Sequence, residues 1–132
     1  MKTIAVISED KVGLLADISY VLAKSKINID SINVAVVSNK AVIALEVSNP
    51  EKSKQVLEAS GYQVESNSLV VKVNNSEVQG LNERLLKEGV KVEKTNTLTR
   101  DEKCSVLALS VDKPKRASTL LQDNLLSNEP TC

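Results

Sequence analysis

The residues between Ser8 and Ile18 have the types and spacing that could do chemistry, and they read Ser8-Glu9-Asp10-Lys11-Val12-Gly13-Leu14-Leu15-Ala16-Asp17-Ile18. Gly13 lets the backbone turn sharply, or lets another molecule approach the main chain closely. A helix that starts here presents free backbone N–H groups at its positive end, where a carboxylate or a phosphate can bind. The alternative interpretation is that Gly13 is only a turn residue, and the motif by itself favours that alternative.

Side chains for catalysis or metal binding are scarce. The chain has no His, which removes the commonest general base and the commonest metal ligand. Cys104 therefore has no imidazole to activate it, and we interpret it as a structural or idle thiol. The charged run Ser8–Lys11 and the pair Asp101-Glu102 are interpreted as solvated turns. We expect no enzyme activity, no cofactor and no metal site.

The totals of the sequence exclude several further classes. Lys plus Arg is 17 and Asp plus Glu is 17 in 132 residues, so the net charge of zero argues against a protein that grips nucleic acid or anionic lipid. No apolar run approaches the roughly 20 residues of a membrane span. Glu9, Asp10 and Lys11 interrupt any secretory leader. The two cysteines, Cys104 and Cys132, are no disulfide framework. We expect a soluble cytoplasmic protein.

The elements that must position the loop come in two successive sets. Hydrophobic periodicity and turn residues define the first set. It comprises strand Thr3–Ile7, helix Val12–Ser25 with Asp10 as N-cap, strand Ile27–Val37 with a bulge near Asp30-Ser31, strand Ala41–Val47, a helix from Asn49-Pro50 to Gly61, and strand Tyr62–Glu65.

The second half repeats this order, with departures. It comprises strand Leu69–Val73, a helix over Val78, Leu81 and Leu85 ending at Gly89, strand Val90–Thr99, strand Ser105–Val111, a helix from Pro114 carrying Ala117, Leu120, Leu121 and Leu125, and a tail Ser127–Cys132. No clear fourth strand follows. Asn74 and Glu77 could form a capping box. Either Gly80 takes the place of Gly13, or Ser76 does and Gly80 lies within the helix.

The duplication is visible in residues as well as in pattern. Ile43–Pro50 lines up with Leu107–Pro114, and Asn33 lines up with Asn96. A β-α-β-β-α-β unit folds as an antiparallel sheet with both helices on one face. We therefore predict an α+β protein of two ferredoxin-like repeats side by side, residues 1–66 and 67–132, the second lacking its last strand. Unpaired strand edges and the bare sheet face would favour self-association.

Two other classes of domain share this element order, and the sequence lacks the residues that their functions require. RNA-binding modules stack bases on aromatic side chains of the central strands, whereas the strands Leu69–Val73 and Ala41–Val47 carry none. A metal-transfer module would need a C-x-x-C in its first loop, and this loop has none.

One family resemblance rests on the first loop and the segment after it. Asp10-Lys11-Val12-Gly13-Leu14-Leu15-Ala16-Asp17-Ile18, followed by Leu22-Ala23 and Ile27-Asn28-Ile29, resembles the ACT domain. The resemblance covers residues 2–66 and 68–126, as in a stand-alone tandem-ACT protein. In the second half Asn74-Asn75-Ser76-Glu77-Val78 replaces the glycine-containing run, which puts a second, equivalent ligand site in doubt.

The resemblance implies a non-catalytic regulatory protein that binds an amino acid or similar small carboxylate at the interface between ACT-like domains. It implies ligand contacts from Asp10, Lys11, Val12, Gly13, Leu14 and Leu15, and from Asn33 and Asn96 in the second strand of each repeat. A solvated strand face is an equally weighted interpretation of both asparagines. The expected partners are a second copy in a homodimer and a regulated enzyme or transcription factor, with no nucleic acid and no membrane.

A second class of function stays open. The chain could be an assembly module that recruits a protein partner through its sheet edges and helices and binds no small ligand. Amino-acid binding, and its dependence on Gly13, separates the two classes. An enzyme is the weakest alternative because the sequence offers no convincing base.

Overall fold

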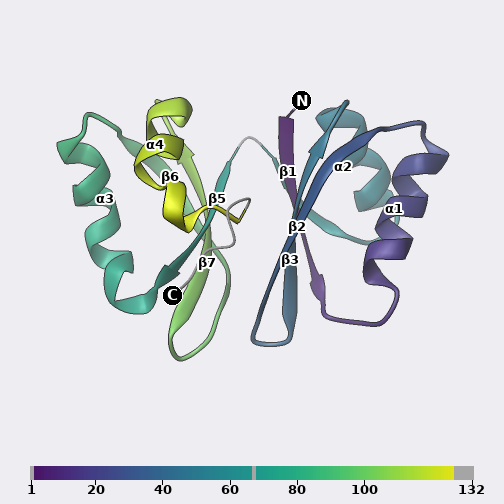
Figure 1. The fold of residues 1–132 in the computed structure, drawn as a ribbon, viewed down its shortest axis with the longest axis horizontal. Coiled ribbons are helices and arrows are strands. Elements are labelled where there is room, and N and C mark those ends of the chain that lie inside the picture. Colours follow the sequence, from purple (N-terminus) through teal and green to yellow (C-terminus); the bar gives the residue numbers. More distant parts are fainter. Residues whose placement is uncertain (1, 67, 127–132) are drawn as a thin grey trace. The chain divides into compact units, whose positions relative to one another are not determined.

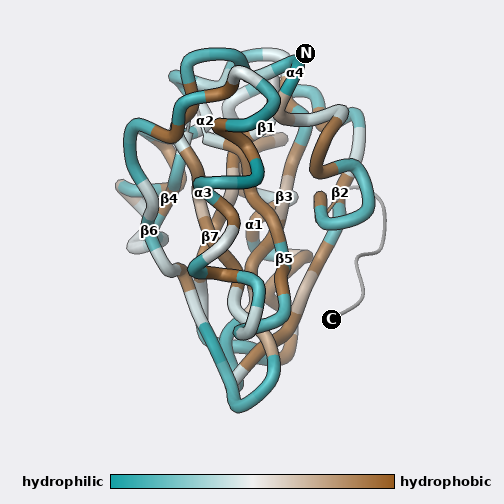
Figure 2. Tube along the Cα trace, turned by 90° about the vertical axis from the view of Figure 1, so that its left-hand side faces the viewer, coloured by the Kyte–Doolittle hydropathy of each residue, from teal (hydrophilic) through white to brown (hydrophobic). Residues whose placement is uncertain are grey.

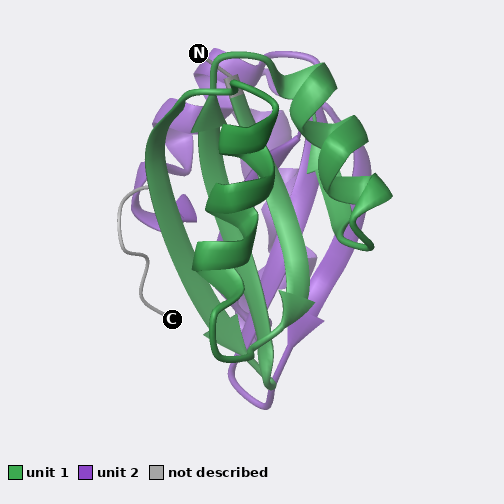
Figure 3. Cartoon of the chain, turned by 90° about the vertical axis from the view of Figure 1, so that its right-hand side faces the viewer, with its two compact units in different colours: residues 1–67 green, residues 68–132 purple. Residues whose placement is uncertain are grey.

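A computed structural model describes residues 2–66 and 68–126. The chain divides into two compact units, residues 1–67 and residues 68–132, drawn in different colours in Figure 3. Each unit is described by itself below, as unit 1 and unit 2.

Unit 1 has the predicted β-α-β-β-α-β order (Figure 1). Its elements are β1 (Lys2–Glu9), α1 (Leu14–Lys24), β2 (Ile29–Val37), β3 (Lys40–Val47), α2 (Pro50–Ala59) and β4 (Gln63–Ser66). The strands form one antiparallel sheet in the order β2-β3-β1-β4, so β2 and β4 are its edges. The register between β2 and β3 shifts between Ile29 and Ser31, which confirms the predicted bulge.

The core of unit 1 lies between this sheet and its helices. Ile4 and Val6 of β1 and Ile43 and Leu45 of β3 share one sheet face, because successive residues of a strand point to opposite sides. These side chains pack with buried residues of both helices, which lie across that face in Figure 3. The helical residues are Leu14, Ile18, Leu22 and Leu57. A core of aliphatic residues therefore fixes α1 and α2 on a single face, as predicted.

Unit 2 repeats the design with a smaller sheet. Its elements are β5 (Leu69–Asn74), the 3₁₀ turn η1 (Asn75–Glu77), α3 (Val78–Lys87), β6 (Val92–Arg100), β7 (Cys104–Val111), α4 (Pro114–Leu120) and the 3₁₀ turn η2 (Gln122–Asn124). The strand order is β5-β7-β6. Strands β5 and β7 consist mostly of apolar residues, while the turn between β6 and β7 is polar (Figure 2). The two-repeat α+β fold is thus confirmed.

Two expectations for unit 2 were wrong, and a third, for its last residues, is untested. Leu125 is not helical: α4 ends at Leu120, and Leu125 forms an isolated antiparallel bridge with Val71 at the place of the missing fourth strand. Cys104 is disulfide-bonded and is not an idle thiol. The predicted tail, with Cys132, lies outside the described residues.

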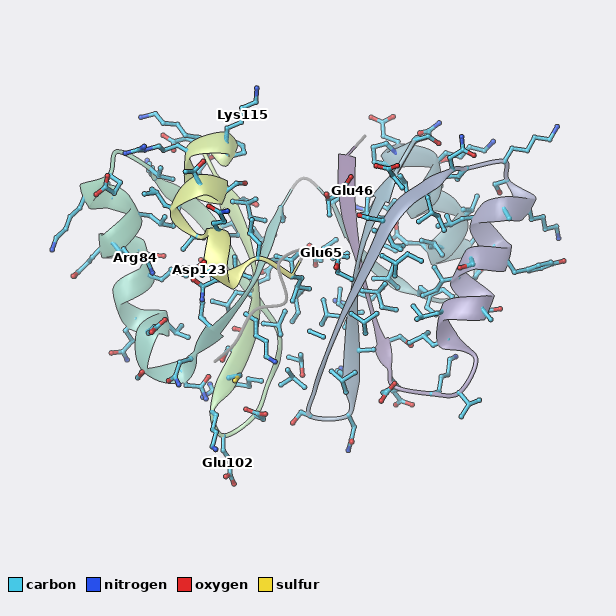
Figure 4. All side chains as sticks on the ribbon, viewed as in Figure 1. Glu46, Glu65, Arg84, Glu102, Lys115 and Asp123 are labelled. Carbon is cyan, nitrogen blue, oxygen red and sulfur yellow. The ribbon has the colours of Figure 1, made fainter. Side chains whose placement is uncertain are left out.

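Polar contacts fix the helices and the hairpin of unit 2. Arg84 of α3 donates a hydrogen bond to the Leu120 carbonyl at 3.1 Å, which ties α3 to the end of α4 (Figure 4). Arg116 and Glu88 form an exposed ion pair at 3.0 Å. Glu102, labelled in Figure 4, lies at the tip of the turn between β6 and β7 and points away from the protein.

Candidate ligand-binding site

The loop between β1 and α1 is held at both ends by backbone hydrogen bonds. The Asp10 N–H donates to the Asn39 carbonyl at 2.9 Å, so the loop starts against the turn between β2 and β3. The Leu14 N–H donates to the Lys11 carbonyl at 3.3 Å. Gly13 lies between these anchors with φ 81° and ψ 6°, a left-handed conformation that a residue with a Cβ atom adopts at a cost. Glycine is therefore the favoured residue at this place.

Helix α1 begins without a side-chain cap. Its N-cap is Gly13, which has no side chain to accept a hydrogen bond, so the prediction that Asp10 caps this helix was wrong. The helix is also shorter than expected, because the left-handed Gly13 delays its start to Leu14. Within the described residues, no acceptor is recorded for the N–H groups of Leu15 and Ala16. These groups point out of the positive end of α1, where an anion is stabilised.

A cavity of about 250 Å³ opens beside this helix end. Its lining combines the loop and the first turn of α1 with β2 and β3: Asp10, Lys11, Gly13, Leu14, Leu15, Ala16, Val34, Ala41 and Ile43. The polar groups come from the loop and the helix end, and the strand side is apolar. The volume lies just below the roughly 300 Å³ at which pockets for drug-sized ligands begin, so the cavity suits a small metabolite.

A tyrosine connects the loop to the rest of unit 1. The Tyr62 hydroxyl donates a hydrogen bond to Asp17 Oδ2 on α1, and the Lys11 Nζ lies 5.7 Å from the centre of the Tyr62 ring. Burial, followed by the hydrogen bond and the charge of Asp17, raises the pKa of Tyr62 to about 12. The phenol therefore stays protonated at neutral pH and remains a donor.

The structure brings most of the predicted loop residues together. Five of them line the cavity, namely Asp10, Lys11, Gly13, Leu14 and Leu15. Val12 belongs to the same loop but is fully exposed and is not part of the lining. The ligand contacts of these residues stay a prediction.

The two strand asparagines lie elsewhere. Asn33 pairs with Ala44, whereas its neighbour Val34 pairs with Ile43 and lines the cavity, so Asn33 lies on the opposite face of the sheet. Asn96 of β6 pairs with Ala108 in unit 2. The equivalent pairing bears out the alignment of the repeats, and the role of both residues in binding stays a prediction.

Four lining residues were not among the predicted contacts: Ala16, Val34, Ala41 and Ile43. A signal for Val34 was present in the sequence, because Ile32, Val34 and Val36 share one phase after the bulge. That phase places Val34 on the same face as Ile43. The sequence does not show how α1 lies on the sheet, and that placement decides which strand residues line the cavity.

The corresponding corner of unit 2 is built differently, with hydrogen bonds from its own asparagine side chains. Asn74 Oδ1 accepts from the Ser76 N–H at 3.0 Å, which caps η1 and does not form the predicted capping box with Glu77. Asn75 donates through Nδ2 to the Asp101 carbonyl at 2.9 Å and accepts from the Ser105 hydroxyl. Gly80 lies within α3, so no left-handed glycine precedes that helix.

The turn behind this corner is also satisfied internally. Asp101 Oδ1 accepts from the Cys104 N–H at 2.7 Å and from the Lys103 N–H at 2.8 Å. These two hydrogen bonds, that of Cys104 first, hold the pKa of the Asp101 carboxyl below its usual range. Unit 2 thus has the fold of unit 1, but a 3₁₀ turn with its own side-chain hydrogen bonds replaces the loop with the left-handed glycine.

The described residues contain neither a candidate membrane-spanning helix nor a candidate metal site. No helix among them has the length and apolarity to cross a membrane. In the same part of the chain, no group of three or more Cys, Asp or Glu side chains is placed to hold a metal ion.

Comparison with known proteins identifies the family of the first unit. Residues 4–60 match the family model of the AHAS small subunit-like ACT domain. Unit 1 contains an ACT domain. The match confirms the resemblance seen at Asp10–Ile18 and ends before unit 2. No curated protein matches the chain.

Solved structures with a similar fold cover both units of the chain. A crystal structure of a protein from Bacteroides thetaiotaomicron is 20% identical, with 92% of this chain and 86% of that chain covered and a TM-score of 0.51. The ligand-free regulatory subunit of aspartate kinase from Thermus thermophilus is 16% identical, with 91% and 87% covered and a TM-score of 0.46. The acetolactate synthase small subunit from Thermotoga maritima is 12% identical, with 94% and 88% covered and a TM-score of 0.43.

Proposed function

We propose that this chain is a non-catalytic regulatory protein whose ACT domain binds an amino acid, or a similar small carboxylate, in the cavity of unit 1. One observation carries the proposal. The N–H groups of Leu15 and Ala16 have no recorded acceptor in the described residues, and they adjoin a cavity of about 250 Å³. A carboxylate supplies the acceptors that these groups lack.

The lining favours an amino acid with an aliphatic side chain. A carboxylate at the end of α1 leaves the ligand's ammonium group near the carboxylate of Asp10, which lines the same cavity. The remaining walls come from β2 and β3, where Val34, Ala41 and Ile43 offer an apolar surface. Burial of aliphatic carbon there contributes about 0.8 kcal/mol for each methylene group.

Regulation would follow from unequal binding. A ligand shifts a conformational equilibrium only to the extent that it binds the two states differently. We propose that the ligand favours one state of assembly or of partner binding. In this proposal the regulated enzyme or transcription factor is a separate chain. This protein and its partner are in the cytoplasm.

Calorimetric titration with valine, leucine and isoleucine, and with the amide of each, tests the proposal. The free acids should bind and the amides should bind at least about tenfold more weakly, because only the acids bring a charged acceptor to α1. Gly13→Val should abolish binding, since a β-branched residue is strongly disfavoured at φ 81°. Gly80→Ala is the matched control and should bind as the unmodified chain does. Equal binding by Gly13→Val would contradict the proposed site.

A second candidate function rests on a different observation. Among the described residues, seven large hydrophobic side chains are exposed, and all but Leu86 belong to the loop, α1 or β2 of unit 1. They are Val12, Leu15, Tyr20, Ile32, Val34 and Val36. Ile32, Val34 and Val36 alternate along β2 and so share one side of it, and a row of exposed apolar residues marks an interaction surface. An assembly module without a small ligand would also show them.

We propose that the surface around β2 pairs with a second copy of this chain. Strand β2 is an edge of its sheet, and between Ser31 and Val37 it carries no charge that would oppose strand pairing. Two copies related by a two-fold axis would set like apolar residues against one another. A homodimer that binds none of the tested amino acids would favour the assembly module over the ligand sensor.

A further inference from the structure

The Lys11 ammonium group lies over the ring of Tyr62, and no counter-ion is recorded for it among the described residues. Lys11 lines the cavity, and its Nζ lies 5.7 Å from the centre of the Tyr62 ring. The salt bridge recorded among the described residues joins Arg116 and Glu88, both in unit 2. A cation over an aromatic face is held only weakly when the site is exposed to water. The charge of Lys11 is therefore available to an anion in the cavity.

Tyr62 is fixed more firmly than Lys11. Its ring belongs to the buried core of unit 1, and its N–H donates to the Leu57 carbonyl at 3.0 Å. Its hydroxyl donates to Asp17, whose own N–H donates to the Gly13 carbonyl at 2.9 Å in the first turn of α1. The ring is thus tied to the same turn that presents the open N–H groups.

We propose that Lys11 is the cationic contact for the ligand's acid group, and that Tyr62 is the residue that positions it. This inference rests on the proposed function, since it names the side chain that selects the acid. The ring keeps the Lys11 ammonium group beside the cavity in the absence of ligand. A carboxylate at the α1 end then draws the ammonium group into a charge-assisted hydrogen bond, which is roughly twice as strong as a neutral one.

Titration of the full-length chain with valine, leucine and isoleucine tests the role of Lys11. Lys11→Met keeps most of the aliphatic stem and should weaken binding about tenfold. Lys24→Met makes the same change of charge in the last turn of α1 and should stay within about twofold. Raising the salt concentration should weaken binding to the unmodified chain and have less effect on Lys11→Met.

A double-mutant cycle tests the role of Tyr62. Tyr62→Leu removes the ring and should weaken binding, but it should cause little further loss when Lys11→Met is already present. A purely structural role would give the same loss in both backgrounds. Tyr62→Phe keeps a ring beneath Lys11 and should bind nearly as well as the unmodified chain.

Tyrosine emission gives a second readout that needs no leucine variant. The chain has two Tyr, no Trp and no Phe, so Tyr20→Phe leaves Tyr62 as the only tyrosine. Saturating amino acid should change the emission of Tyr62 in this variant, and adding Lys11→Met should remove that change.

The outcomes separate the inference from the function on which it rests. Failure of the unmodified chain to bind any of the three amino acids would overturn the proposed function. Binding by the unmodified chain that Lys11→Met leaves unchanged, in affinity and in salt dependence, would overturn the role of Lys11 alone. Equal losses from Tyr62→Leu in both backgrounds would overturn the role of Tyr62.

Discussion

At the scale of the residue, Gly13 and Gly80 are the same amino acid in opposite situations. Gly13 has φ 81° at the start of α1, whereas Gly80 lies within α3. A Cβ atom added to either would meet no heavy atom within 4 Å. The two sites therefore differ in backbone conformation and not in available space.

This difference predicts opposite effects of the same substitution. Gly13→Ala should destabilise the protein by about 1 kcal/mol, because alanine is disfavoured in the left-handed region. Gly80→Ala should stabilise it by roughly 0.5–1 kcal/mol, since alanine is the better residue inside a helix. Urea unfolding of both variants measures the change. Destabilisation by both would mean that a contact of the glycines had been overlooked.

The raised pKa of Tyr62 predicts a loss of stability at high pH. A phenol whose pKa is about 12 in the folded chain and 10.0 in a model compound keeps its proton longer when folded. Its contribution is complete below about pH 10 and disappears as the pH rises to about 12. Thermal unfolding between these values should show a fall in Tm for the unmodified chain and a smaller one for Tyr62→Phe. Parallel curves would contradict the predicted shift.

Among the residues that line the cavity, those of the loop were expected from the sequence and those of the strands were not. Gly13 and its neighbours form a local motif, so the family resemblance included them among the expected contacts, and five of those residues line the cavity. Ala41 and Ile43 line the cavity from a strand some thirty residues away. Such contacts depend on how α1 lies on the sheet, which a pattern within one segment does not contain.

At the scale of the element, β2 and β6 are matching edge strands with different surfaces. Ile32 pairs with Leu45 in unit 1, and Thr95 pairs with Leu109 at the equivalent position in unit 2. Strand β6 also carries Glu93, Lys94 and Arg100, and it has two register shifts where β2 has one. Charges and bulges discourage edge-to-edge pairing. Strand β2 of unit 1 is therefore less protected against pairing with another strand than β6 of unit 2.

Lysine at these two positions tests the contribution of β2 to self-association. Ile32→Lys should weaken the proposed homodimer at least about tenfold, because it would place a charge within the proposed apolar contact. Thr95→Lys should leave the association unchanged. Sedimentation velocity over a range of concentrations measures both. A dimer that survives Ile32→Lys, or one that Thr95→Lys disrupts, would place the interface elsewhere.

Hydrophobic periodicity predicted the order of the elements correctly, but it did not always predict where each element begins or ends. The bulge at Asp30 was predicted because the apolar phase changes there. The cap of α1 was misassigned because Asp10 has a good capping side chain, yet its N–H bonds Asn39 and the helix starts only after Gly13. Leu125 fits a helical stripe, but bridging Val71 satisfies part of an exposed strand edge.

At the scale of the whole molecule, the described residues form two units of one fold that differ at the start of their first helices. In unit 1 the first turn of α1 has N–H groups with no recorded acceptor among the described residues. In unit 2 Asn74 and Asn75 use their own side chains at that corner. We therefore predict one ligand per chain.

The molar ratio at saturation measures this prediction directly. Calorimetry should give one bound amino acid for each chain, with the concentration of protein fixed by amino-acid analysis. Gly13→Val should remove this site without exposing a weaker second one. A ratio of two in the unmodified chain would show that unit 2 also binds, despite the side-chain hydrogen bonds at its corner.

The asparagine-filled corner of unit 2 has a further consequence for how the two halves exchange their amide protons. Asn74 and Asn75 hold their corner whether or not a metabolite is present, so its protection against deuterium should be set by the chain alone. The corner at Gly13 should exchange quickly in the empty protein and slow down as the metabolite accumulates. Deuterium uptake should therefore fall with rising amino-acid concentration at the Gly13 corner of unit 1, and it should stay constant at the Asn74 corner of unit 2.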